Sequence, residues 1–128
     1  MRRIIYSSVA TAGSAAAEAP AILREARTHN GLDGITGLLC AHGDRFLQVF
    51  EGPEDSVALT WARIRADQRH RDLDVLADQD VAAPEFGDWS MAYRDQGHPA
   101  DMLGERLRVL LAGVSEAVAH RFRGFVAG

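Results

Sequence analysis

The sequence predicts an α+β protein, and three observations point to that class. Segments with the two-residue alternation of strands are interleaved with segments whose apolar residues recur at helical spacing. The 128 residues, 47% hydrophobic and 25% charged, fit one domain with a substantial core and leave no room for a second. One strand segment carries an amide, Gln48, among apolar side chains. We therefore expect a single domain that contains a buried polar site.

The first strand and the first helix are predicted within residues 3–31. Residues 3–9 alternate weakly and are rich in Ile, Tyr and Val, which favour strands. The small residues of 10–17 indicate a loop, and helical spacing begins at Glu18 with Pro20 in the first turn, where proline is tolerated. We expect this helix to end near Gly31, because glycine readily adopts the left-handed conformation that stops a helix.

A hairpin and a second helix follow. Two apolar runs, 34–41 and 45–51, are separated by His42-Gly43-Asp44, which has the length and composition of a hairpin connection. The two strands should therefore pair antiparallel. Pro53 then falls in the first turn of a second helix, with two acids suited to the positive end of its dipole. The buried stripe of this helix is predicted to be Val57, Trp61 and Ile64.

Two further strands complete the predicted sheet. Residues 73–76 form the fourth strand, and residues 88–93 alternate as a fifth. The order strand, helix, strand, strand, helix, strand, followed by an added strand, is that of a ferredoxin-like βαββαβ fold.

The strand that carries Gln48 is apolar on both faces. Alternation places Phe46, Gln48 and Phe50 on one face, and the apolar residues between them on the other. Two helices on one side would leave the second face exposed to water. We therefore expect the tail, about 99–122 with a helix break at Gly113, to cover it.

Gln48 and Tyr6 are the polar residues that matter most in this core. A buried amide must find hydrogen-bond partners, either from neighbouring backbone or from a bound polar ring. In a ferredoxin-like sheet the first strand lies beside the strand with Gln48, so the hydroxyl of Tyr6 and this amide are expected to meet. Such a hydrogen bond is equally compatible with a purely structural role.

Other polar or aromatic residues also have two interpretations. Asn30 suits the end of a helix before glycine, and residues 67–71 suit a solvated helix end with cations at its negative pole. The same segment suits the binding of a phosphate or polyol. Trp89 and Met91 are of types that more often pack in a core than contact a cofactor.

Charge and cysteine content exclude several classes. The net charge of −4, without long runs of either sign, gives no electrostatic footprint for direct nucleic-acid binding. The one cysteine, Cys40, lies in an apolar run and implies no disulfide framework. We expect a cytoplasmic protein that does not bind membranes, because the N-terminus lacks a signal-peptide pattern and no segment is long enough to span a bilayer.

Together these segments resemble the BLUF family, blue-light sensors that use flavin, over roughly residues 2–94. Each motif alone is weak, but the family's order and spacing are kept across all of them. The motifs are Ile5-Tyr6-Ser7-Ser8, His29-Asn30 with Gly34-Ile35-Thr36-Gly37-Leu38-Leu39, Arg45-Phe46-Leu47-Gln48-Val49-Phe50-Glu51-Gly52-Pro53, Ile64-Arg65-Ala66-Asp67 with Arg69-His70, and Phe86-Gly87-Asp88-Trp89-Ser90-Met91. The chain departs from the pattern in lacking a basic residue shortly after Tyr6 and in having Phe50 where leucine is commoner.

The resemblance implies a flavin between the two helices on one face of the sheet. FAD is the flavin expected, with FMN and riboflavin as alternatives. Gln48 would bridge Tyr6 and the flavin ring, and these two residues would carry the photochemistry. The implied cofactor-binding residues are Ile22, His29, Asn30, Gln48, Ile64, Arg69 and His70.

The resemblance also implies how a signal would leave the domain. Residues 1–95 would form the flavin-binding core, and 96–128 a helical cap of the same domain that serves as output element. Trp89 and Met91, in the fifth strand, would relay the change at Gln48. Similarity to short stand-alone members implies no enzymatic activity, an unidentified downstream protein as partner, and a homo-oligomer.

Two other classes stay open at the level of the sequence. One is a ferredoxin-like ligand-binding or interaction module without photochemistry. The other is a small enzyme, for which ferredoxin-like acyl-phosphate hydrolases are a precedent in architecture alone. Such an enzyme needs an anion-cradling loop, and residues 10–17 contain one glycine and no arginine.

Overall fold

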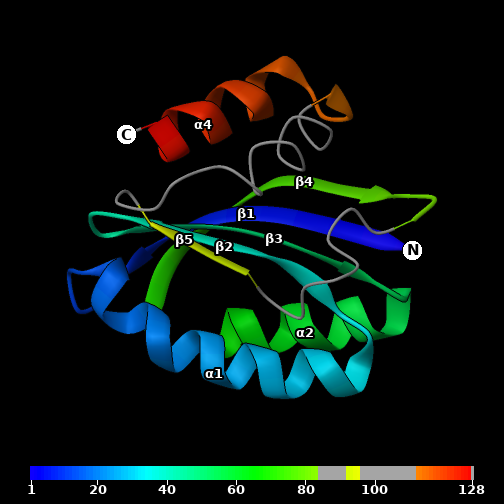
Figure 1. The fold of residues 1–128 in the computed structure, drawn as a ribbon, viewed down its shortest axis with the longest axis horizontal. Helices are drawn as coiled ribbons and strands as arrows, with labels where there is room; N and C mark the ends of the chain where they lie inside the picture. The colour runs from blue at the N-terminus through cyan, green and yellow to red at the C-terminus, as the bar shows by residue number, and fades with distance from the viewer. Residues whose placement is uncertain (84–91, 96–111, 128) are drawn as a thin grey trace.

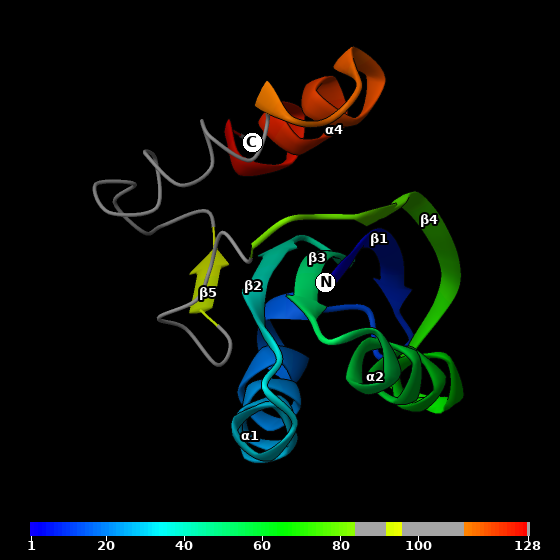
Figure 2. The ribbon, with the colours of Figure 1, turned by 90° about the vertical axis from the view of Figure 1, so that its right-hand side faces the viewer.

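The computed structural model describes residues 1–83, 92–95 and 112–127, and it has three layers. A five-stranded sheet forms the middle layer (Figure 1). Helices α1 (Ala15–Asp33) and α2 (Glu54–Ala66) lie side by side on one face, and α4 (Glu116–Ala127) lies on the other (Figures 1 and 2). The predicted α+β class and its arrangement of helices are confirmed. Within the described residues, no helix combines the length and the apolar character needed to cross a bilayer.

The sheet has the order β4-β1-β3-β2-β5. Its strands are β1 (Arg2–Ala10), β2 (Thr36–His42), β3 (Arg45–Gly52), β4 (His70–Asp80) and β5 (Ala92–Asp95). The first four pair antiparallel in the ferredoxin-like order, and β5 is added parallel to β2. The hairpin between β2 and β3 turns at Gly43, whose φ of 61° is accessible to glycine at little cost. The predicted fold, with its added fifth strand, is confirmed.

Helix α1 is longer than predicted at both ends. It begins at Ala15 because the hydroxyl of Ser14 accepts a hydrogen bond from the Ala17 amide at 3.2 Å, which is an N-cap interaction. Pro20 therefore lies inside the helix and not in its first turn. The left-handed stop is Gly34, with φ of 72°, and the prediction of an end near Gly31 was wrong.

Strand β4 was predicted too short. It runs from His70 to Asp80, because the edge of β1 offers hydrogen bonds along this whole length. Its pairing shifts register twice, and Asp72 adopts a left-handed φ of 56° at one of these irregularities. His70 thus begins a strand instead of belonging to a solvated helix end.

The C-terminal predictions are tested only in part. The structure has β5 at Ala92–Asp95, where the sequence predicted 88–93, so the two overlap at two residues. Residues 84–91 and 96–111 lie outside the described part of the chain, and with them Trp89, Met91 and the start of the predicted tail. Helix α4 begins three residues after Gly113 and ends at Ala127.

The two faces of β3 are buried as the alternation predicts. Phe46 and Phe50 lie in the core with residues of β1, α1 and α2. Leu47 and Val49, on the second face, are 1% and 0% exposed. Val118 of α4 is also buried, and α4 contacts β2 on that side of the sheet.

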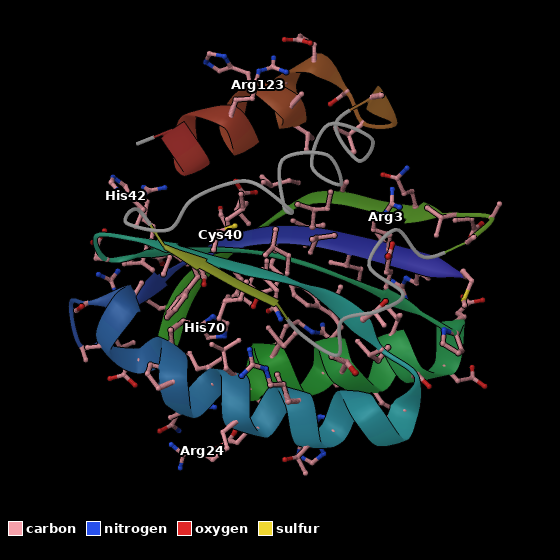
Figure 3. All side chains as sticks on the ribbon, in the orientation of Figure 1. Arg3, Arg24, Cys40, His42, His70 and Arg123 are labelled. Atoms are coloured by element: carbon pink, nitrogen blue, oxygen red, sulfur yellow. The ribbon has the colours of Figure 1, made fainter. Side chains whose placement is uncertain are left out.

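An ion pair is buried on this second face. Arg3 of β1 and Glu51 of β3 are directly opposed in register, with the Arg3 Nε 3.0 Å from the Glu51 Oε2. Their side chains are 6% and 0% exposed. Arg3 lies on the α4 side of the sheet, whereas His70 lies on the side of α1 and α2 (Figure 3). Since Tyr6 and Gln48 are paired in the same two strands, this ion pair sits behind the sheet that holds them.

Gly37→Ala is expected to destabilise the fold by about 3 kcal/mol, as severe overpacking does. An added Cβ would collide with the Val49 carbonyl oxygen and lie 3.0 Å from the Phe50 Cα, so β2 and β3 would have to separate. Urea denaturation measures the change. Gly43→Asn is the control, because nothing lies within 4 Å of the added Cβ there and asparagine tolerates positive φ. Equal stability of the Gly37→Ala and wild-type proteins would contradict the packing of these strands.

Candidate flavin site

Tyr6 and Gln48 meet at the centre of the sheet. They are direct cross-strand partners in the β1–β3 register, and both are buried, at 3% and 4% exposed. The Tyr6 hydroxyl donates a hydrogen bond to the Gln48 Oε1. The predicted contact between the two side chains is therefore present.

Aromatic rings surround the phenol of Tyr6. The ring of Trp61, from α2, has its centroid 5.2 Å away, and those of His70 and Phe50 lie at 6.0 and 6.3 Å. Burial, with a smaller contribution from the Asp67 carboxylate, raises the pKa of Tyr6 far above its usual value. The phenol is thus held neutral, with its proton directed at Gln48.

A cavity opens in front of this pair, between α1 and α2. Its volume is about 110 Å³. Its apolar lining comes from Ile22, Ala26, Leu39, Phe46 and Ile64. Its polar lining comes from Tyr6, Glu25, His29, Gln48, Thr60, Arg63, Asp67, Arg69 and His70.

The cavity gathers most of the residues that the sequence singled out. Ile22 and His29 come from α1, Ile64 from α2, Arg69 from the connection between α2 and β4, and His70 from the start of β4. Tyr6 and Gln48 form its sheet side. The backbone of Asn30 lies within α1 and not at a helix end, because the helix continues to Asp33.

His70 lines the cavity with both ring nitrogens already engaged. Its Nε2 lies 2.7 Å from the Ile64 carbonyl oxygen, and its Nδ1 lies 2.8 Å from the Ser8 Oγ. A carbonyl only accepts, so Nε2 carries the proton and Nδ1 of the neutral ring accepts from the Ser8 hydroxyl. His70 therefore connects β1 to the last turn of α2 by hydrogen bonds, which helps to hold Ile64 in place at the cavity wall.

Arg69 is held by two carboxylates. Its Nη2 lies 2.6 Å from the Asp67 Oδ2 and 2.8 Å from the Glu25 Oε2. Burial of Asp67 disfavours its charge, but hydrogen bonds and the positive charge of Arg69 outweigh this and lower the pKa of that carboxyl. Arg69 thus faces the mouth of the cavity as part of a charged cluster.

Several lining residues were not among those predicted to bind the cofactor. They are Glu25, Ala26, Leu39, Phe46, Thr60, Arg63 and Asp67. Helical spacing was the signal that could have found the helical ones. Glu25, Ala26 and His29 follow Ile22 at intervals of three, four and seven, and Arg63, Ile64 and Asp67 follow Thr60 at the same intervals.

The residues present fit an isoalloxazine ring. Such a ring needs apolar walls and a few convergent polar groups that fix its orientation. Ile22 and Ile64 face the cavity from opposite helices, and the buried Gln48 supplies an amide with donors and an acceptor at its inner end. The charged cluster lies at the partly exposed side, where polar portions of a flavin are compatible with water.

Comparison with known proteins identifies relatives of the same kind. The family model described as BLUF, sensors of blue-light using FAD, matches residues 1–92. The photoactivated adenylate cyclase subunit beta of Euglena gracilis is 39% identical over 70 residues, which are 55% of this chain and 8% of that protein. The photoactivated adenylate cyclase subunit alpha-like protein FB of the same organism is 33% identical over 107 residues, 82% of this chain and 10% of that protein.

Solved structures agree with this relationship. The dark-state structure of the BLUF protein BlrB has a TM-score of 0.69 at 27% identity, and the match covers 88% of this chain and 85% of BlrB. BlrP1 of Klebsiella pneumoniae, in its calcium and cyclic-diGMP complex, has a TM-score of 0.77 at 30% identity, covering 98% of this chain and 34% of BlrP1. The chain spans about a tenth or less of the length of the cyclase subunits. With the family model matching most of its length, the chain belongs to the BLUF family of blue-light sensors that use FAD.

Proposed function

We propose that this protein is a blue-light photoreceptor in which Tyr6 is the photochemical donor and Gln48 the side chain that changes its hydrogen bonds. The observation that carries the proposal is the Tyr6 to Gln48 hydrogen bond at the inner end of the cavity. A bound flavin absorbs blue light and, once excited, is a strong oxidant. The phenol of Tyr6 is the oxidisable group nearest to Gln48 in that wall.

The geometry suits a coupled loss of an electron and a proton by Tyr6. Oxidation makes a phenol strongly acidic, and the Tyr6 proton already points at the Gln48 Oε1. An amide that receives a proton on its oxygen returns to neutrality either in the same form or with its donors and acceptors exchanged. Rotation and tautomerisation of Gln48 both give such an exchange, and Tyr6 recovers its electron and proton in either case.

The binding roles are those that the family resemblance implies. Ile22 and Ile64 would grip the ring, and Asn30 would bond its carbonyl and imide edge from α1. His29 and Arg69, at the mouth, would line the ribityl and pyrimidine side together with His70. The flavin is FAD in the family description, and FMN and riboflavin share the same ring.

The sheet register supports a relay toward the C-terminal part of the chain. Leu39 of β2 is paired with Gln48 on one side and with Tyr93 of β5 on the other. We propose that Trp89 and Met91, which precede β5, pass the change at Gln48 to residues 96–128. That segment would act as the output cap on the core of residues 1–95, with α4 already seated against β2.

The output would be regulation of a separate protein or of an oligomer interface, in the cytoplasm. The relatives named photoactivated adenylate cyclases join such a light-sensing segment to a regulated activity. A rearranged hydrogen bond can bias only an element with two arrangements, and the C-terminal cap is the candidate for that element.

A visible spectrum before and after illumination tests the proposal. We expect an oxidised-flavin spectrum that shifts slightly to the red under blue light and recovers in darkness. An unchanged spectrum of flavin-loaded protein would contradict a photoreceptor function. A colourless protein that takes up no flavin would instead favour a ligand-binding or interaction module without photochemistry.

A further inference from the structure

The two helices that wall the cavity pack on the sheet and leave a gap between them. Helix α1 contacts β1 and β2, and α2 contacts β1 and β3. Figure 2 views the two helices nearly end-on, on the same side of the sheet, and the cavity lies between them. A rigid ring held between them leaves more easily when the helices or their side chains move apart. Links between α1 and the α2 segment therefore bear on how long a flavin stays bound.

One link is an ion pair between Asp33 and Arg63. The Asp33 Oδ2, at the last residue of α1, lies 3.3 Å from the Arg63 Nη2 of α2. The same Arg63 nitrogen donates to the Thr60 Oγ1 at 3.2 Å, which steadies it on its own helix. The two charged side chains are 32% and 41% exposed, so this pair is partly screened by solvent.

A second link joins Glu25 to Arg69. The Arg69 guanidinium is held by Asp67, two residues earlier in the chain. It also reaches across the mouth of the cavity to Glu25 of α1. The side chains of Arg69 and Glu25 are 27% and 64% exposed. Because Asp67 fixes Arg69, the bond to Glu25 resists separation of the two walls.

The two links bracket the mouth of the cavity. Glu25 and Asp33 are eight residues apart on α1, which is about 12 Å along a helix. His29, a lining residue, stands midway between them. Glu25, the earlier of the two on α1, pairs with Arg69, which lies beyond the end of α2. Asp33, the later one, pairs with Arg63 within α2. Both ends of the opening are thus held by opposite charges.

We propose that Glu25 and Asp33 are positioning residues that set the residence time of the flavin by latching α1 to the α2 segment. The proposal rests on the placement of the flavin in this cavity. Neither residue needs to touch the ring. Release requires both latches to open, and because both are partly exposed, salt weakens them. Flavin release should therefore accelerate with ionic strength.

The test compares flavin release from holoprotein variants in which only the acidic partner is changed. Glu25→Gln and Asp33→Asn leave Arg69 and Arg63 in place. Released flavin is followed by its fluorescence after dilution. At low salt we expect each variant to release flavin about two- to fivefold faster than wild type, as exposed ion pairs allow, and the double variant to combine the effects. Added salt should accelerate wild type toward the double variant and change the double variant little.

Asp78→Asn is the matched control. It breaks the partly exposed Arg2–Asp78 pair, which joins β1 to β4 and does not line the cavity. Release rates equal to wild type in both latch variants, or an equal acceleration in Asp78→Asn, would overturn the proposal.

A charge swap distinguishes loss of the Asp33–Arg63 ion pair from a general destabilisation of the two helices. Asp33→Arg alone should speed release, and adding Arg63→Asp should slow it again by restoring opposite charges. A swap variant that releases flavin as fast as Asp33→Arg would count against the latch. The light-induced spectral shift is a separate readout: its absence in flavin-loaded wild type would refute the photochemistry, whereas the release rates judge the latch.

Discussion

Tyr6→Phe is expected to keep its flavin and to lose the light-induced red shift. Phenylalanine preserves the ring that packs against Trp61 and Phe50, so the cavity wall should keep its shape. It removes the hydroxyl that donates to Gln48, and with it the proton and the easily oxidised phenol. The absorption difference between illuminated and dark samples of this variant should be no larger than the difference between two samples kept in the dark.

The chain contains one other tyrosine, which provides the control. Tyr93→Phe removes a phenol from β5 and should keep a red shift of the wild-type kind. Gln48→Glu, which replaces the amide while keeping its size, should bind flavin and lose the shift as Tyr6→Phe does. A normal photocycle in Tyr6→Phe would refute the assigned role of this residue.

Removing one partner of the Arg3–Glu51 pair is expected to cost about 3–5 kcal/mol of folding free energy. Glu51→Gln leaves the Arg3 guanidinium buried without its counter-charge, and Arg3→Met does the same to Glu51. The double replacement Arg3→Met with Glu51→Gln should recover part of the loss, because both charges of the pair are then removed. Denaturant unfolding of the four proteins gives the coupling energy as a double-mutant cycle.

The exposed Arg2–Asp78 pair is the natural comparison. Its side chains are 23% and 43% exposed, so Arg2→Gln should change stability by less than about 1 kcal/mol. If Glu51→Gln were as mild as Arg2→Gln, the buried environment of the Arg3–Glu51 pair would be in doubt.

The sheet and its central contact were predictable because local patterns determine them. Alternation fixes which side chains share a face, and the short connection through Gly43 fixes the register of β2 against β3. Ferredoxin-like order then brings β1 beside β3. These two steps place Tyr6 and Gln48 on neighbouring strands, and the observed register of β1 against β3 makes them direct partners.

The ends of α1 and the length of β4 were not predictable in this way. Gly31 and Gly34 are equally able to stop a helix, and the choice of Gly34 follows from packing, since it lies against Pro53 at the start of α2. Strand β4 lacks apolar alternation because its side chains are largely exposed. It is a strand because β1 supplies hydrogen bonds.

The charged part of the site was missed for a related reason. Glu25, Asp33 and Arg63 have the appearance of solvated helix residues, and a sequence gives no sign that they face one another. Only the packing of α1 and α2 on one sheet brings them together. The apolar walls, in contrast, follow from helical spacing at Ile22 and Ile64.

The irregular course of β4 also affects how copies of this protein could associate. As one of the two outer strands of the described sheet, β4 has one side that pairs with no other described strand and could pair with a strand of another molecule. Its two register shifts and the left-handed Asp72 interrupt the straight ladder that such pairing needs. The exposed acidic side chain of Asp80 would further repel a second copy of the same strand. These features disfavour assembly of two copies through β4, and the strand next to Tyr6 would be protected from aggregation.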